Sequence, residues 1–100
     1  MRGNPIELHV DLDVEPTKGK DLESTFHTVF EPIISKQPGF VSVNLLKLRA
    51  AAVTYRLVIS FETEEQRVTW VATADHERVW PQMEKNLKGV KFTAALWDKL

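Results

Sequence analysis

Strict alternation of apolar and polar residues near the start of the chain most constrains its fold. Residues 6–14 read Ile-Glu-Leu-His-Val-Asp-Leu-Asp-Val, so every second side chain is apolar. Successive side chains of a β-strand point to opposite faces of its sheet, and this period of two predicts a half-buried strand. One face of the predicted sheet is therefore apolar, and the other carries Glu7, His9, Asp11 and Asp13.

The period changes to that of a helix over residues 17–36. One apolar stripe at helical spacing contains Leu22, Phe26, Val29, Phe30 and Ile33. Thr17 is the expected N-cap, and Pro32 is expected to kink or break the helix because proline lacks an N–H group. The segment Gln37-Pro38-Gly39 is a stop and turn signal.

Residues 40–49 and 53–62 are rich in β-branched and aromatic residues and predict two further strands. Their connection, residues 50–52, is three alanines, which is poor turn chemistry. A helix over residues 45–52 is the local alternative, but the flanking composition favours a hairpin.

Thr63-Glu64-Glu65-Gln66 has the pattern of a capping box and predicts the start of a second helix. This helix is expected to run to Lys88-Gly89, with a break near Asp75 as a second N-cap. Its expected apolar side contains Val68, Val71, Ala72, Val79, Met83 and Leu87, and Trp70 lies away from it. Residues 90–97 predict a fourth strand.

The predicted order βαββαβ is that of an α+β, ferredoxin-like fold, a four-stranded antiparallel sheet with two helices on one face. Residues 1–100 are expected to form a single domain. The same two helices are not expected to cover all of the remaining large apolar residues, which are Phe40, Leu46, Leu48, Tyr55, Leu57 and Trp97. A homodimer with sheet-on-sheet packing would cover the second face.

Composition narrows the function classes. The chain has 13 Lys and Arg against 14 Asp and Glu, a net charge of −1, which argues against a dedicated nucleic-acid binder. It contains no cysteine, which excludes disulfides, thiolate metal ligands and a cysteine nucleophile. No signal peptide or membrane span is visible, so a cytoplasmic protein is expected. The phosphate-binding glycine motifs and the nucleophile elbow are also missing, so we expect no cofactor.

Several features together resemble the antibiotic biosynthesis monooxygenase family. They are the turn Gln37-Pro38-Gly39-Phe40, the strand exit Phe61-Glu62-Thr63-Glu64-Glu65, and Trp70 followed by His76. The resemblance covers roughly residues 6–97 and implies a dimeric α+β barrel with a small-molecule pocket between sheet and helices. The family includes cofactor-free oxygenases of phenols and quinols, and relatives that degrade haem.

The residues distinguish these two branches. In the haem-degrading branch an Asn of the first strand, a Trp of the second helix and a His ten residues later form the site. Trp70 matches that Trp, but Trp80 stands at the His position and residues 6–14 contain no Asn. In the cofactor-free oxygenases an Asn precedes the matching Trp by four residues, and here that position is Gln66.

The resemblance favours a cofactor-independent monooxygenase that oxidises a phenolic or quinol-type molecule with dioxygen. His76 and His9 are the candidate catalytic residues, because histidine accepts protons near neutral pH. The candidate substrate-binding residues are Trp70, Trp80, Gln66, Asn44 and Arg56. The competing functions are a non-catalytic binding protein for small ligands, and an isomerase or lyase on the same scaffold.

Structural alternatives exist for most of these side chains. His76 could satisfy a helix break, Trp70 could serve dimer packing, and Arg56 could pair with Glu7 or Asp11. Trp80 fits a core position better than a binding role. A metal site on Glu7, His9 and Asp11 would need further ligands, so no metal is expected.

Overall fold

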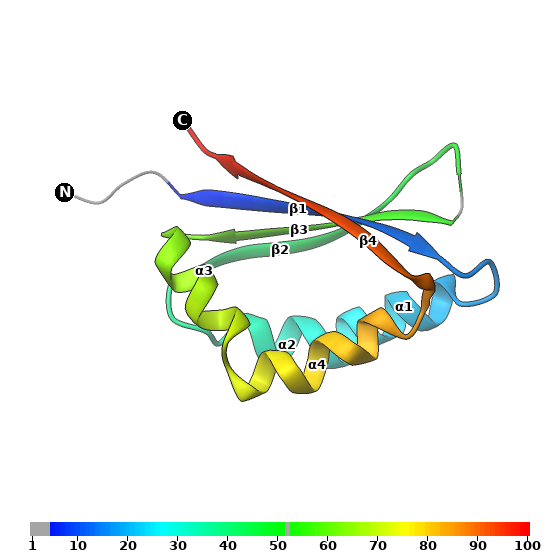
Figure 1. Cartoon of the computed structure of the whole chain (residues 1–100), viewed down its shortest axis with the longest axis horizontal. Coiled ribbons are helices and arrows are strands. Elements are labelled where there is room, and N and C mark those ends of the chain that lie inside the picture. Colours follow the sequence, from blue (N-terminus) through cyan, green and yellow to red (C-terminus); the bar gives the residue numbers. More distant parts are fainter. Residues whose placement is uncertain (1–4, 52) are drawn as a thin grey trace.

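The computed structural model describes residues 5–51 and 53–100, and there the chain has the predicted order βαββαβ. The strands are β1 (Ile6–Val14), β2 (Phe40–Lys47), β3 (Thr54–Phe61) and β4 (Leu87–Asp98). They form one antiparallel sheet in the order β2-β3-β1-β4. Figure 1 shows all helices on the same face of this sheet, which confirms the ferredoxin-like plan.

Strand β1 matches its predicted bounds and lies inside the sheet, between β3 and β4. Val10 is paired with Leu57 of β3 and Ala94 of β4, and it is buried under the helices. His9 is paired with Val58 and Ala95 and points to the opposite face. The alternation in the sequence therefore correctly separates the two faces.

The first helical segment is continuous but contains a π-helical turn. It consists of α1 (Gly19–Thr25), the π turn η1 (Phe26–Phe30) and α2 (Glu31–Ile34). Thr17 is not its N-cap, because Lys18 holds that position without a side-chain bond. The N–H of Glu31 donates to Phe26 O, five residues back, and this wider turn precedes Pro32 without ending the helix.

The π turn also changes which isoleucine enters the core. Regular α-helical spacing from Leu22 predicts Ile33, but Ile34 is fully buried and Ile33 is only half-buried. An α-helix returns to the same face after about 11 residues, and the additional residue of the π turn moves that position by one.

The second helical segment is broken into α3 (Glu64–Val71) and α4 (Ala74–Glu84). The predicted cap at Thr63 is confirmed, since its hydroxyl accepts from Gln66 N at 3.1 Å. The break is confirmed too, but its N-cap is Thr73 rather than Asp75. The predicted apolar side is wrong in α3: Trp70 is 3% exposed, whereas Val68 and Val71 are 51% and 43% exposed. Burying one indole removes more apolar surface from water than burying a valine.

The end of α4 and the start of β4 also differ from the prediction. The helix ends at Glu84 and β4 begins at Leu87, so Lys88 and Gly89 belong to the strand. The pairing of β1 with β4 shifts register between Leu12 and Val14, and Gly89 has a positive φ of 62° near this irregularity. The β2–β3 hairpin is confirmed over the described residues, and Ala52 of its predicted turn lies outside them.

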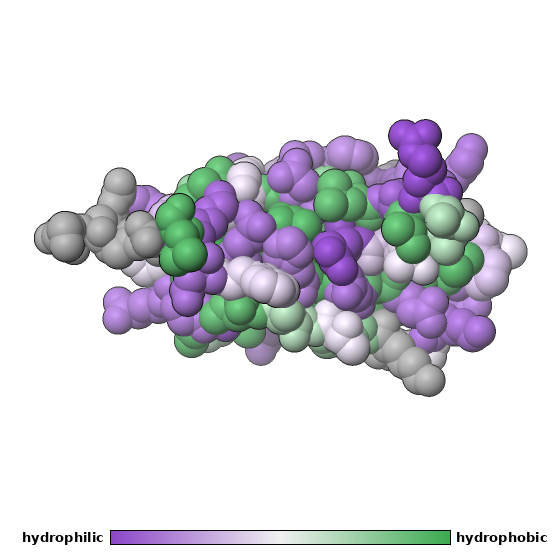
Figure 2. All heavy atoms as spheres, turned by 90° about the horizontal axis from the view of Figure 1, so that it is seen from above, coloured by the Kyte–Doolittle hydropathy of each residue, from purple (hydrophilic) through white to green (hydrophobic). Residues whose placement is uncertain are grey.

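The two faces of the sheet differ in cover. Of the six large apolar residues that the two helices are not expected to cover together, Tyr55 and Leu57 are buried under the helices, because they share the parity of Ile59 and Phe61 along β3. Phe40 packs edge-on against Phe61. Leu46, Leu48 and Trp97 are exposed. Figure 2 looks onto the face of the sheet that no helix covers, called the open face below, and shows apolar patches among polar groups.

Candidate functional site

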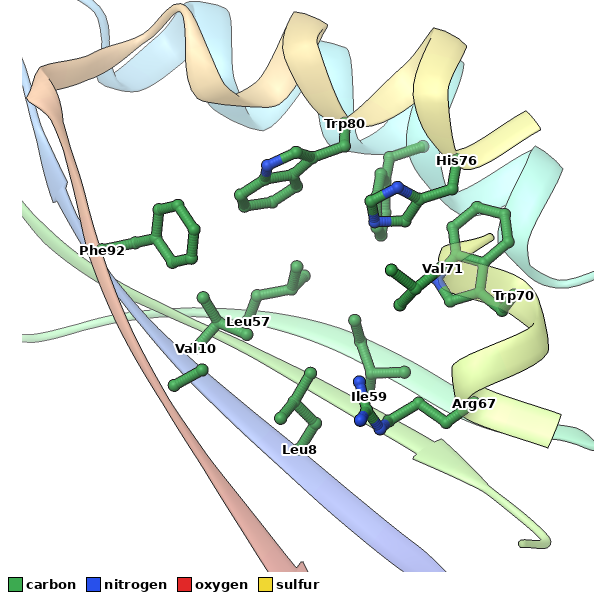
Figure 3. Close-up of a pocket in the computed structure, with 12 residues that line it drawn as sticks. Leu8, Val10, Leu57, Ile59, Arg67, Trp70, Val71, His76, Trp80 and Phe92 are labelled. Atoms are coloured by element: carbon green, nitrogen blue, oxygen red, sulfur yellow. The ribbon is translucent and has the colours of Figure 1, made fainter. Parts of the chain in front are cut away.

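A cavity of about 350 Å³ lies between the helices and the sheet. Its walls come from η1, α3, α4 and three strands, and most of its lining is apolar. The strands contribute Leu8, Val10, Leu57, Ile59, Phe92 and Ala94. Figure 3 shows the helical side chains projecting toward these strand residues across the cavity. The volume is at the lower end of the range of about 300–1,000 Å³ typical of small-molecule sites.

Aromatic rings line the helical side of the cavity. The His76 ring lies 5.1 Å from the Trp70 ring, edge to face, and 6.4 Å from the Trp80 ring, nearly parallel to it. Trp80 meets Phe92 of β4 edge-on at 5.3 Å, and Phe30 contacts both indoles. The predicted residues Trp70, His76 and Trp80 are thus brought together, in a site suited to a flat aromatic ligand.

The break between α3 and α4 sets the relative position of Trp70 and His76. The Thr73 hydroxyl donates to Trp70 O at 2.7 Å and accepts from His76 N at 3.1 Å. One side chain therefore satisfies a carbonyl at the end of α3 and an N–H at the start of α4.

His76 lies in a poorly solvated position. Burial lowers its pKa below the ordinary value of 6.5, and the opposing effect of Glu77 is smaller. The imidazole is therefore neutral at pH 7. Neither ring nitrogen hydrogen-bonds to another group in the described part of the chain, so a lone pair is available to a ligand proton.

Sequence reasoning missed Arg67, which also lines the cavity. Its side chain is 19% exposed, and Nε and Nη2 donate to the two carboxylate oxygens of Glu64 at 2.6 and 2.8 Å. This pairing raises the pKa of Arg67 and lowers that of Glu64. Arg67 lies three residues before Trp70, and that helical spacing was a signal that the two share a face.

Gln66 does not line the cavity. Its side chain packs against Gly39, where a Cβ atom would lie only 2.0 Å from Gln66 Oε1. Gly39 has a φ of 80°, so both its backbone and its neighbour favour glycine. The Gln66 carbonyl oxygen accepts from the Thr63 hydroxyl at 3.1 Å.

The remaining predicted residues lie on the open face of the sheet. His9 Nε2 is 2.8 Å from Glu7 Oε1, and Arg56 donates to both carboxylate oxygens of Asp11 at 2.6 and 3.3 Å. Asn44 is exposed beside them on β2. A separate hollow of about 270 Å³ is lined in part by His9, Arg56 and Trp97. The sheet thus separates His9, Asn44 and Arg56 from the cavity that contains His76.

Comparison with known proteins gives a family match and shared folds at low sequence identity. The model of the family described as antibiotic biosynthesis monooxygenase matches residues 5–80. No curated protein matches the sequence. Across the described residues, no helix is long and apolar enough to cross a membrane.

Solved structures match almost the whole chain at low sequence identity. A proposed antibiotic biosynthesis monooxygenase from Bordetella bronchiseptica is 19% identical, with a TM-score of 0.87 over 97% of this chain and 98% of its own. SnoaB from Streptomyces nogalater, a cofactor-independent oxygenase, is 16% identical, with a TM-score of 0.83 over 97% and 94%. A conserved protein from Methanosarcina mazei is 11% identical, with a TM-score of 0.84 over 97% and 94%.

Proposed function

The chain belongs to the antibiotic biosynthesis monooxygenase family, and on this premise we propose that it oxidises a phenolic or quinol-type small molecule with dioxygen, without a cofactor. The observation that carries the proposal is the neutral His76 imidazole between two indoles in an apolar cavity. The fold shared with SnoaB, a cofactor-independent oxygenase, adds support.

In this reaction the substrate itself supplies the electrons. His76 accepts the proton of a phenolic hydroxyl, or of an acidic carbon beside a carbonyl, and the resulting anion is electron-rich enough to reduce dioxygen. With an anthrone, one oxygen atom of dioxygen becomes the oxygen of the new carbonyl group in the product, and the other leaves as water. Trp70, Trp80 and Phe92 hold the planar ring and exclude water from the site.

A homodimer through the open face of the sheet belongs to the same proposal. Leu46, Leu48 and Trp97 are exposed there, and Trp97 has 58% of its surface accessible. A second copy of the chain would cover these residues and enclose the Glu7–His9 contact and the Asp11–Arg56 ion pair between the two sheets.

Oxygen uptake with a panel of hydroquinones and anthrones tests the reaction. We expect uptake by the wild-type protein and a loss of about 10²–10⁴-fold for His76→Ala, the usual contribution of a general base. His9→Ala removes the same side chain on the opposite face of the sheet and is expected to retain uptake.

The alternatives give different results. Tight binding of aromatic compounds without any oxygen uptake would favour a binding protein. Product formation under strict anaerobiosis would favour an isomerase or lyase. Loss of uptake in His9→Ala, with uptake kept in His76→Ala, would move the reaction to the open face.

A further inference from the structure

Arg67 carries the charge of an otherwise apolar cavity. Of the described residues that line it, only Arg67 and His76 have ionisable side chains, and His76 is neutral at pH 7. Guanidinium groups stay charged at any physiological pH, so the wall contains a permanent positive charge beside apolar side chains. An uncharged aromatic ligand would leave this charge without a partner from the ligand.

The guanidinium is oriented but not saturated. Glu64 engages Nε and Nη2, which fixes the plane of the group. Nη1 makes no hydrogen bond to any protein group within residues 5–51 and 53–100. It can therefore donate to a ligand while the pair with Glu64 persists.

Arg67 and His76 approach the cavity from different helices. Figure 3 shows Arg67 extending from α3 toward Leu8 and Ile59 on the sheet side, whereas His76 projects from α4 on the helical side. One aromatic ring between them can present an acidic proton to His76 and a different substituent to Arg67.

We propose that the substrate is an aromatic carboxylate, and that Arg67 binds its carboxylate and thereby selects it over uncharged aromatics. This inference rests on the proposed function for the position of the reacting group. The carboxylate accepts from Nη1 of Arg67, the ring fills the apolar space, and the acidic hydrogen at the opposite end faces His76. Arg67 is thus a specificity-determining residue, and Glu64 both orients its guanidinium and competes with the ligand for it.

Equilibrium binding of 2-naphthoate and 2-naphthol tests this assignment without any turnover. The two probes share a ring system and differ in charge at pH 7. Quenching of Trp70 and Trp80 in a Trp97→Phe background reports binding at the cavity, because Trp97 lies on the other face. We expect 2-naphthoate to bind about tenfold more tightly, the ratio that one charge-assisted hydrogen bond supplies.

Variants assign the preference to one side chain. Arg67→Gln should remove the preference for 2-naphthoate and leave 2-naphthol binding within about twofold, while Arg67→Lys should keep part of it. Glu64→Gln should strengthen 2-naphthoate binding, because the competing carboxylate is gone. Arg78→Gln is the matched control, since Arg78 pairs with Asp75 at the same i,i+3 spacing on an exposed helix surface.

Three results would overturn the assignment: equal affinity for both probes, a preference that survives in Arg67→Gln, or no binding of either probe. These experiments measure binding and not turnover. Their outcomes therefore stay valid even if the protein does not oxidise the substrate. Thermal unfolding followed by circular dichroism shows whether Arg67→Gln has folded. If it has not, the affinities of Arg67→Lys for the two probes decide the question.

Discussion

The two faces of the sheet are formed by the same strands but differ in their cover, because the helices pack on one face only. The helix-covered face buries Val10, Leu57 and Trp70 and leaves one apolar cavity next to a neutral histidine. On the open face, Arg56 forms an ion pair with Asp11, the His9 ring lies within hydrogen-bond distance of Glu7, and Trp97 is exposed near them.

This difference shows how one alternating strand can supply two surfaces. Burial on one face stabilises the subunit and lowers the pKa of His76. On the other face, Asp11 and Arg56 form a solvated ion pair, and the exposed apolar residues are available to a second copy. The following predictions test this division, from the largest expected effect to the smallest.

Replacement of a tryptophan should lower the stability of the subunit strongly on one face of the sheet and only slightly on the other. Trp70→Ala removes a buried indole that packs on Phe30 and should lower the free energy of unfolding by about 3–5 kcal/mol. Trp97→Ala should change it by about 0.5 kcal/mol at protein concentrations where subunits are separate. Urea denaturation measures both, and equal losses would contradict the division.

Self-association should respond to the open face only. Trp97→Asp places a charge where the second sheet would pack and should weaken dimerisation by about 2 kcal/mol, roughly 30-fold. Val68→Asp, at an exposed apolar position on α3, is the matched control and should leave the dimer intact. Sedimentation at micromolar concentration decides; a monomeric wild-type protein would remove the role assigned to the open face.

The two threonine caps should separate a stability effect from an effect on the cavity. Thr63→Ala and Thr73→Ala each lose an N-cap hydrogen bond and should each cost about 1 kcal/mol. Only Thr73→Ala frees Trp70 from the start of α4, so only that variant should also change tryptophan emission and weaken the binding of aromatic ligands. Identical emission spectra for both variants would refute the role of Thr73 in setting the cavity.

The smallest effect concerns pH. The pKa of His76 is lowered in the folded state. Between this folded-state pKa and about pH 6.5, the unfolded state therefore binds more protons than the folded state. The corresponding stability is therefore present above pH 6.5 and is lost as the pH falls from 6.5 through the folded-state pKa. Denaturation at pH 5 and pH 7 should show a smaller pH dependence in His76→Gln than in the wild type, and His27→Gln measures what an exposed histidine contributes.

The sequence predicts the fold well because its strongest signals are local and periodic. Alternation in residues 6–14 is enough to place Val10 and His9 on opposite faces of the sheet, and the Thr63 cap marks the start of α3 correctly. Val68 and Val71 predict the wrong apolar side for α3, because the large indole of Trp70 takes the buried position and both valines stay exposed.

The site is harder to predict because it depends on distant parts of the chain. Trp70, His76 and Trp80 can be selected within one helical region, but Phe92 comes from β4 and joins them only after folding. Arg67 is not predicted as a site residue, because its i,i+3 spacing from Glu64 is typical of an ion pair on an exposed helix surface. The position of Gln66 beside Gly39 depends on a contact between the start of α3 and the turn before β2, which no periodicity encodes.

The π turn at Phe26–Phe30 has a consequence for how chains of this kind can vary in length. The turn holds one residue more than an α-helix needs, and the ring of Pro32 would clash with the carbonyl four residues before it in regular α-helical geometry. A chain shortened by one residue here should therefore tolerate the loss only together with Pro32→Ala. We accordingly expect this inserted residue and this proline to be inherited together, and relatives that lack the proline to have a helix one residue shorter.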